Sequence, residues 1–256
     1  MTARMVSRVK ARRVDWRSVV SVAIVAVVFV LPMRALLRYQ GPPMEEGFML
    51  VFPERLLAGD LPHRDFLHLY GPGSLWALAG WYKILGVSIT AERLFGMAQL
   101  AGIVFGVMAL VWPWGRRVAT AAGVLGVLLT TTAIGLTALA WNGAVALLVW
   151  SMWAGLRARR TSDATVAARW WTTAGALAGV ALLFRPDVIV AVGLGALAML
   201  AGQGLARWGR WLLGAVPVLA LYLVHLATSG PSNAIRGMVI EPVGSSVASK
   251  SKPWNM

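Results

Sequence analysis

The chain contains no cysteine and few charged residues for its length of 256. The absence of cysteine excludes disulfides and cysteine-ligated metal sites. Charged residues make up 13% of the chain, against about 25% in a typical soluble domain, and hydrophobic residues make up 58%. With a mean hydropathy of +0.69, this composition indicates an integral membrane protein.

Acidic residues are also scarce, because 10 Asp and Glu accompany 24 Lys and Arg and leave a net charge of +14. In a soluble protein this excess would suggest nucleic-acid binding. A membrane-spanning helix needs about 20 mostly apolar residues. We therefore predict an all-α integral membrane protein with about seven transmembrane helices. The predicted spans are 18–38, 90–112, 118–137, 139–156, 170–185, 187–204 and 211–229.

The positive charge is concentrated on one side of these spans. We place the N-terminus in the cytoplasm and let the short apolar segment 73–86 lie at the outer interface without crossing. The inner side then carries 14 of the 24 Lys and Arg with two acids, and the outer side carries the other 10 with eight acids. This asymmetry follows the positive-inside rule. It predicts a multi-pass plasma-membrane protein with an extracytoplasmic C-terminus and no nucleic-acid partner.

Three regions follow from this topology. Residues 1–17 form a basic cytoplasmic segment, and residues 18–229 form the membrane module. Residues 230–256 are expected to be a disordered or truncated outer tail. The first outer loop, 39–89, is long enough to contain two juxtamembrane helices. Pro53 is expected to kink the first of these helices.

The stretch from Gly41 to Gly73 holds five of the ten acids, among them the adjacent pair Glu45 and Glu46. A carboxylate at the membrane surface can take a proton from an acceptor hydroxyl, so this pair is the candidate catalytic group. The alternative is that both acids only favour the start of a helix, whose N-terminus attracts negative charge.

Other polar residues on the outer side are candidates for binding a lipid phosphate. They are His63, Arg64, Asp65, His68, Lys83, Asn142, Arg185 and Asp187. A simpler interpretation stays open for most of them. The residues of the first loop could form a polar loop without function, Arg185 and Asp187 could supply a polar turn, and Asn142 could cap a helix. The loop histidines have few other ligands in reach, so we expect no metal site, and His225 is interpreted as an interfacial histidine.

Residues 45–96 resemble the first extracytoplasmic loop of the GT-C-fold glycosyltransferases, which include protein O-mannosyltransferases and lipid A aminoarabinose transferases. They read EEGFMLVFPERLLAGDLPHRDFLHLYGPGSLWALAGWYKILGVSITAERLFG. The loop of that group has an acidic pair followed by Gly and a helix ending in L-L-x-G. This helix is followed by the motif P-x-R-D-F, then by a Gly- or Pro-rich turn and an aromatic-rich helix. Each of these features is present here.

The resemblance implies an inverting glycosyltransferase whose donor is a sugar on polyprenyl phosphate. Glu45 would act as the base or orient the acceptor, with Glu46 beside it, while Arg64 and Arg185 would bind the phosphate. The implied partners are membrane lipids and a glycan or protein acceptor, with no cofactor.

The chain departs from the pattern of the group in four respects. One is Pro53, which interrupts a helix that is usually uninterrupted in the group. The first acid of the pair is usually Asp and is Glu45 here, and many members carry a second acid where this chain has Asn142. The group's members continue with further spans, so we expect the chain to correspond to their N-terminal module.

Two other function classes remain to be distinguished from the enzyme. One is a non-catalytic membrane protein that binds or translocates polyprenyl lipid. The other is a solute transporter, which is disfavoured because the spans carry almost no mid-membrane charge and show no internal repeat.

Overall fold

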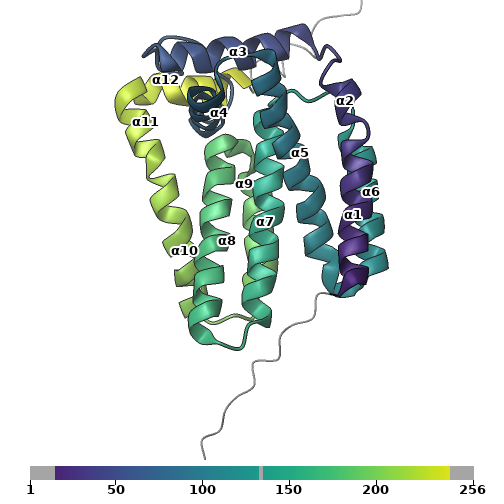
Figure 1. The fold of residues 1–256 in the computed structure, drawn as a ribbon. Helices are drawn as coiled ribbons and strands as arrows, with labels where there is room; N and C mark the ends of the chain where they lie inside the picture. Colours follow the sequence, from purple (N-terminus) through teal and green to yellow (C-terminus); the bar gives the residue numbers. More distant parts are fainter. Residues whose placement is uncertain (1–14, 133–134, 243–256) are drawn as a thin grey trace, which may run out of the picture.

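The computed structural model describes residues 15–132 and 135–242, and these residues form helices and loops with no strand. The long helices run side by side as a bundle (Figure 1). They are α1 (Trp16–Val30), α5 (Ile89–Val111), α6 (Arg116–Thr130), α7 (Ala140–Arg160), α8 (Ala164–Phe184), α9 (Ile189–Leu200), α10 (Leu205–Leu219) and α11 (Leu221–Ser229).

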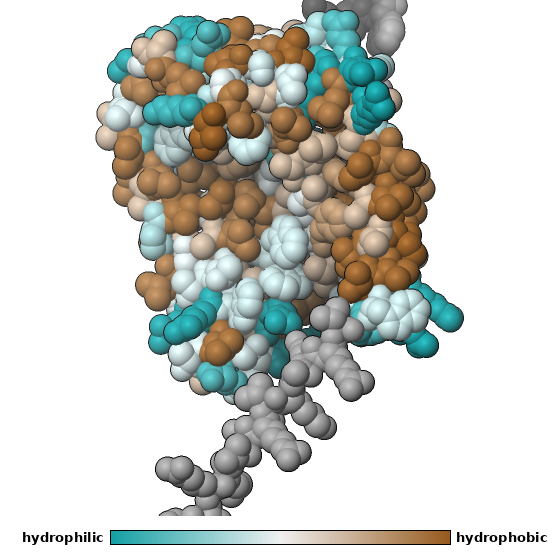
Figure 2. Space-filling view, in the orientation of Figure 1, coloured by the Kyte–Doolittle hydropathy of each residue, from teal (hydrophilic) through white to brown (hydrophobic). Residues whose placement is uncertain are grey.

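Each predicted span overlaps a helix of this bundle, although the predicted span 118–137 extends past the end of α6 at Thr130. Four segments are long and apolar enough to cross a membrane: Trp16–Leu36, Ile89–Trp114, Ala164–Phe184 and Leu205–Ser229. The segment Pro186–Leu200 is apolar but shorter. The sides of the bundle are apolar and the hydrophilic residues gather toward its two ends (Figure 2). The all-α membrane fold expected from composition is confirmed.

Three helices lie across one end of the bundle, which we call the capped end (Figure 1). They are α3 (Pro43–Leu57), α4 (Pro72–Leu85) and α12 (Pro231–Ile235). The helix α4 is the segment predicted to remain at the interface, and it lies across the end of the bundle and not along the long helices (Figure 1). It has only 14 residues, and Leu75, Leu78 and Tyr82 on it are almost fully buried.

The helix α3 continues through Pro53 because a side chain replaces the missing hydrogen bond. Proline has no N–H, so the carbonyl of Met49, four residues earlier, would lack its helical donor. The hydroxyl of Tyr82 in α4 donates to this carbonyl at 3.0 Å. One hydrogen bond therefore completes α3 and attaches it to α4.

The predicted disorder of the C-terminal tail is wrong for residues 231–242. After α12 the chain continues as a π-helix from Arg236 to Ile240. Gly237 packs directly on the ring of His63, where an added Cβ would overlap. This packing orders the segment over the first loop. Residues 1–14 and 243–256 lie outside the described residues.

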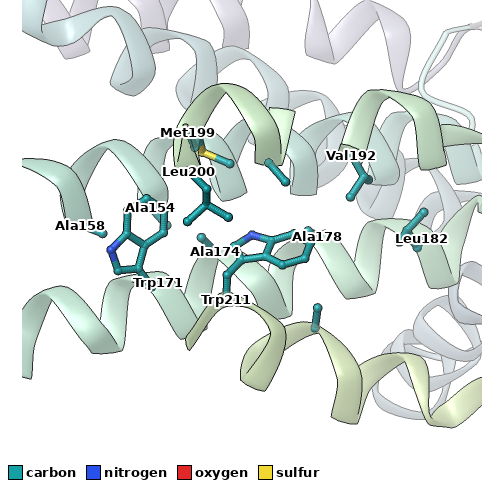
Figure 3. Packing of buried hydrophobic residues seen from close by; sticks show 12 residues of the cluster. Ala154, Ala158, Trp171, Ala174, Ala178, Leu182, Val192, Met199, Leu200 and Trp211 are labelled. Carbon is teal, nitrogen blue, oxygen red and sulfur yellow. The ribbon is translucent and has the colours of Figure 1, made fainter. Parts of the chain in front are cut away.

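Small residues allow the helices to pack closely. In Figure 3 the indoles of Trp171 and Trp211 lie between helices that present alanines such as Ala154 and Ala174 to them. A Cβ on Gly175 in α8 would overlap the backbone of Trp211 in α10. Such close backbone approach through small residues is typical of helix packing in membranes.

Candidate functional site

The helix α3 places both acids of the predicted pair in its first turn. Pro43 occupies the first helical position, where its fixed φ suits a helix start. Glu45 and Glu46 follow within the same turn, and the helix dipole favours their negative charge. Adjacent residues in a helix point about 100° apart, so the two carboxylates face different surroundings.

Glu46 is buried and tightly paired. Its residue is 7% exposed, and its two oxygens accept from Arg93 of α5 at 2.8 Å (Nε to Oε1) and 3.0 Å (Nη2 to Oε2). The same guanidinium donates from Nη1 to the carbonyl of Leu37 at 2.7 Å. A bidentate pair with a third bond fixes Glu46 in one position and attaches α3 to α5.

Glu45 has no such partner. Its side chain is half-buried and makes no hydrogen bond or ion pair within the part of the chain that the structure describes. The pair is therefore divided between a fixed carboxylate and a free one. The free carboxylate is available to a molecule that approaches the start of α3.

A carboxylate of α5 holds the loop that precedes α7. Glu92 is 0% exposed, and its Oε1 accepts from the backbone N–H of Ala138 at 2.6 Å. One turn later, a Cβ on Gly96 would overlap the carbonyl of Leu136. The adjacent residues Glu92 and Arg93 thus fix two different segments around the start of α3.

The linker between α2 (Met33–Leu36) and α3 crosses directly over this cluster. Gly41 is buried, and a Cβ there would lie 2.9 Å from both Glu46 Oε1 and Thr137 Oγ1. Next to it is an open hollow of about 390 Å³ lined by residues 39–43. The hollow is therefore adjacent to the acidic pair.

All three histidines of the chain form a separate buried cluster at the capped end. His63 Nδ1 lies 2.8 Å from Nε2 of His225 in α11, and the rings of His63 and His68 are 5.8 Å apart. Burial lowers the pKa of His63, and burial with the neighbouring imidazoles lowers the pKa of His68 to about 3. His225 is 2% exposed, and its ring nitrogens lie within hydrogen-bond distance of His63 and Ser229, so it is a histidine with satisfied hydrogen bonds that attaches α11 to the loop.

Arg64 and Arg185 each pair with a nearby aspartate. Arg64 donates to Asp65 at 2.8 Å, and this bond lowers the pKa of the Asp65 carboxyl. Arg185 donates to Asp187 at 2.9 Å and 2.5 Å, and its guanidinium lies 4.7 Å from the ring centre of Tyr70. The α8–α9 turn and the first loop therefore meet at Arg185 and Tyr70. Phosphate binding by Arg64 and Arg185 stays a prediction.

The remaining two predicted residues have contrasting environments. Lys83 is exposed in the last turn of α4. Asn142 is buried within the first turn of α7, whose N-cap is Leu139. The interpretation of Asn142 as a helix cap is therefore wrong. Its role in substrate contact stays a prediction.

The sequence interpretation missed Arg93 and Glu92, which carry the most buried charges near α3. Adjacent opposite charges at the start of an apolar span were the available signal, because charge in such a position is costly unless it is paired or functional. In the described ranges 15–132 and 135–242, no group of three or more His, Cys, Asp or Glu side chains is arranged to hold a metal ion.

Comparison with known proteins identifies a fold and no family. By sequence, the chain matches no protein family and no curated protein. By structure, it is similar to ArnT from Cupriavidus metallidurans, which was crystallised with undecaprenyl phosphate bound, with a TM-score of 0.63 and 18% identity. The match covers 86% of this chain and 43% of that chain, so this chain spans less than half of ArnT. The chain therefore has a GT-C-like membrane fold.

Proposed function

We propose that this protein is a membrane glycosyltransferase that moves a sugar from a polyprenyl-phosphate donor to an acceptor hydroxyl at the capped end. The observation that carries the proposal is the division of the acidic pair. Arg93 holds Glu46 with two bonds, and Glu45, one residue away, remains half-buried and free.

The chemistry suits a carboxylate in this position. The acceptor oxygen attacks the anomeric carbon, a new carbon–oxygen bond forms, and the bond from that carbon to the phosphate oxygen breaks. The phosphate leaves with the bonding electrons, and Glu45 receives the proton of the hydroxyl as general base. Attack opposite the leaving group inverts the anomeric centre.

Two further observations support the donor class. The fold is similar to a protein with undecaprenyl phosphate bound. The free carboxylate also lies at the end of an apolar bundle, where a lipid phosphate would meet water. Arg64, Arg185 and Lys83 remain predictions for stabilising the departing phosphate.

The test is sugar transfer by purified protein in lipid nanodiscs. The probe is undecaprenyl phosphate carrying a radiolabelled hexose or pentose, with a solubilised membrane fraction as the source of acceptors. Glu45→Gln should abolish transfer and leave binding of undecaprenyl phosphate intact. Glu54→Gln is the matched control, since Glu54 is an exposed acid on the same helix with no ionic partner among the described residues.

Two results would count against the proposal. Transfer by Glu45→Gln at the wild-type rate would remove Glu45 from the mechanism. Wild-type protein that binds the lipid phosphate and releases no sugar, with any acceptor fraction, would instead support a lipid-binding or lipid-translocating protein.

A further inference from the structure

We infer that Arg34 and Arg38 form the subsite that binds the phosphate of the polyprenyl lipid, beside the hollow lined by residues 39–43. The inference rests on the proposed function, because it assigns the lipid end of that donor. It differs from the sequence prediction, which placed the phosphate on Arg64 and Arg185.

The first argument comes from the partners of the basic residues. Eight Lys and Arg of the described chain lie at the capped end, and five of them are already bound to an acid. The five pairs are Arg55–Asp60, Arg64–Asp65, Arg93–Glu46, Arg185–Asp187 and Arg236–Glu241. Binding of a phosphate by any of these arginines would have to displace a carboxylate. The three that have no acidic partner among the described residues are Arg34, Arg38 and Lys83.

The second argument is position. Arg38 follows Leu37, whose carbonyl accepts from Arg93, and precedes Tyr39, which lines the hollow. Arg38 is therefore one residue away both from the cluster that holds Glu46 and from the hollow. No residue of α4 lines this hollow, so Lys83 is not equivalent.

The two arginines also share a side of the chain. Helical winding continues past the end of α2, because the N–H groups of residues 38 and 39 both donate to the carbonyl of Ala35. Arg34 and Arg38 are thus separated by about one turn, a spacing that places side chains next to each other. Both are exposed, and two planar guanidinium groups can bind a phosphate with paired hydrogen bonds.

The third argument is the apolar surface that leads to this pair. Arg34 lies near the end of the apolar segment Trp16–Leu36. Val30 and Leu31 just before it are 61% and 73% exposed. Apolar residues at the end of the neighbouring helix α6 are exposed as well. The surface over α1 and α6 is accordingly hydrophobic (Figure 2). A lipid tail lying along it would bring its phosphate to Arg34 and Arg38.

The same chemistry would attract the headgroup of an ordinary anionic phospholipid, and the experiment must separate the two sources. Binding of tritiated undecaprenyl phosphate is measured on purified protein, with phosphatidylglycerol or inorganic phosphate as competitor. The double variant Arg34→Gln/Arg38→Gln should bind about 10- to 100-fold more weakly, as expected for loss of hydrogen bonds to a charged group. Arg236→Gln, an exposed arginine elsewhere on the capped end, should bind as the wild type does.

Three outcomes would overturn the inference. The first is wild-type affinity in the double variant. The second is equal competition by phosphatidylglycerol, which marks a general anionic-lipid site. The third is loss of binding only in Arg64→Gln/Arg185→Gln. Arg34→Lys/Arg38→Lys, which keeps the charge, should retain part of the affinity and serves as the folded comparison if the glutamine variant proves unstable.

The outcome for this subsite is separable from the outcome for the proposed function. Lipid-phosphate binding that depends on Arg34 and Arg38, without sugar transfer, supports the subsite and contradicts the enzyme. Sugar transfer that is unchanged in the double variant supports the enzyme and contradicts the subsite.

Discussion

Replacing Arg93 with alanine should be among the most destabilising single changes near α3. The substitution removes three hydrogen bonds, two to Glu46 and one to the carbonyl of Leu37. It also leaves the carboxylate of Glu46, whose side chain is only 9% exposed, without a counter-charge. Loss of one partner from a buried pair costs about 3–5 kcal/mol.

The free energy of unfolding can be followed in mixed micelles with increasing dodecyl sulfate, using the fluorescence of the 13 tryptophans. Arg236→Ala is the matched control, because that ion pair has side chains 72% and 36% exposed and should contribute about 0–1 kcal/mol. Adding Glu46→Gln to Arg93→Ala should restore part of the stability, since it removes the unpaired charge. Equal losses in Arg93→Ala and Arg236→Ala would refute the reasoning.

Three further predictions use the same unfolding assay. Because the pKa of His68 falls from 6.5 to about 3 in the folded protein, the unfolded chain binds more protons below pH 6.5. The contribution of His68 to the free energy of unfolding should therefore be fully present above pH 6.5 and be lost as the pH falls toward 3, with a slope approaching about 1.4 kcal/mol per pH unit. His68→Gln should reduce this slope, and an unchanged slope in the variant would contradict the prediction. Gly96→Ala should destabilise by about 1–3 kcal/mol through overlap with the loop before α7. Gly80→Ala should stabilise α4 by about 0.5–1 kcal/mol, because an added Cβ there has no atom within 4 Å. Similar effects of the two substitutions would count against close packing at Gly96. Tyr82→Phe should cost about 1–3 kcal/mol because the carbonyl of Met49 loses its donor; a neutral result would show that α3 does not need this bond.

The helices and their arrangement were largely predictable. Apolar runs of about 20 residues have few alternatives to a membrane helix, because a backbone in lipid must satisfy its hydrogen bonds internally. Charge asymmetry then predicted that α4 would not cross. The error at residues 231–242 has a physical cause as well. The position of that segment depends on tertiary contacts, such as the packing of Gly237 on His63 and the burial of Ala234, which the sequence does not show.

The candidate site was predictable in its location and not in its pairings. A sequence shows that Glu45 and Glu46 are adjacent but not which one finds a cation, since that depends on which face of α3 meets α5. The partner, Arg93, is 47 residues away from Glu46 along the chain. The sequence likewise does not show that the side chains of Arg64 and Arg185 are bound to Asp65 and Asp187.

The amino-acid sequence is enough to predict a helical membrane protein with an acidic pair in its first long loop. Those properties follow from composition, from the length of apolar runs and from local spacing, which act without reference to distant residues. The packing of the helices determines that Glu46 is bound, and that Glu45, Arg34 and Arg38 have no ionic partner within residues 15–132 and 135–242. Ion pairs and burial depend on segments that are remote in the chain and meet only when the bundle packs.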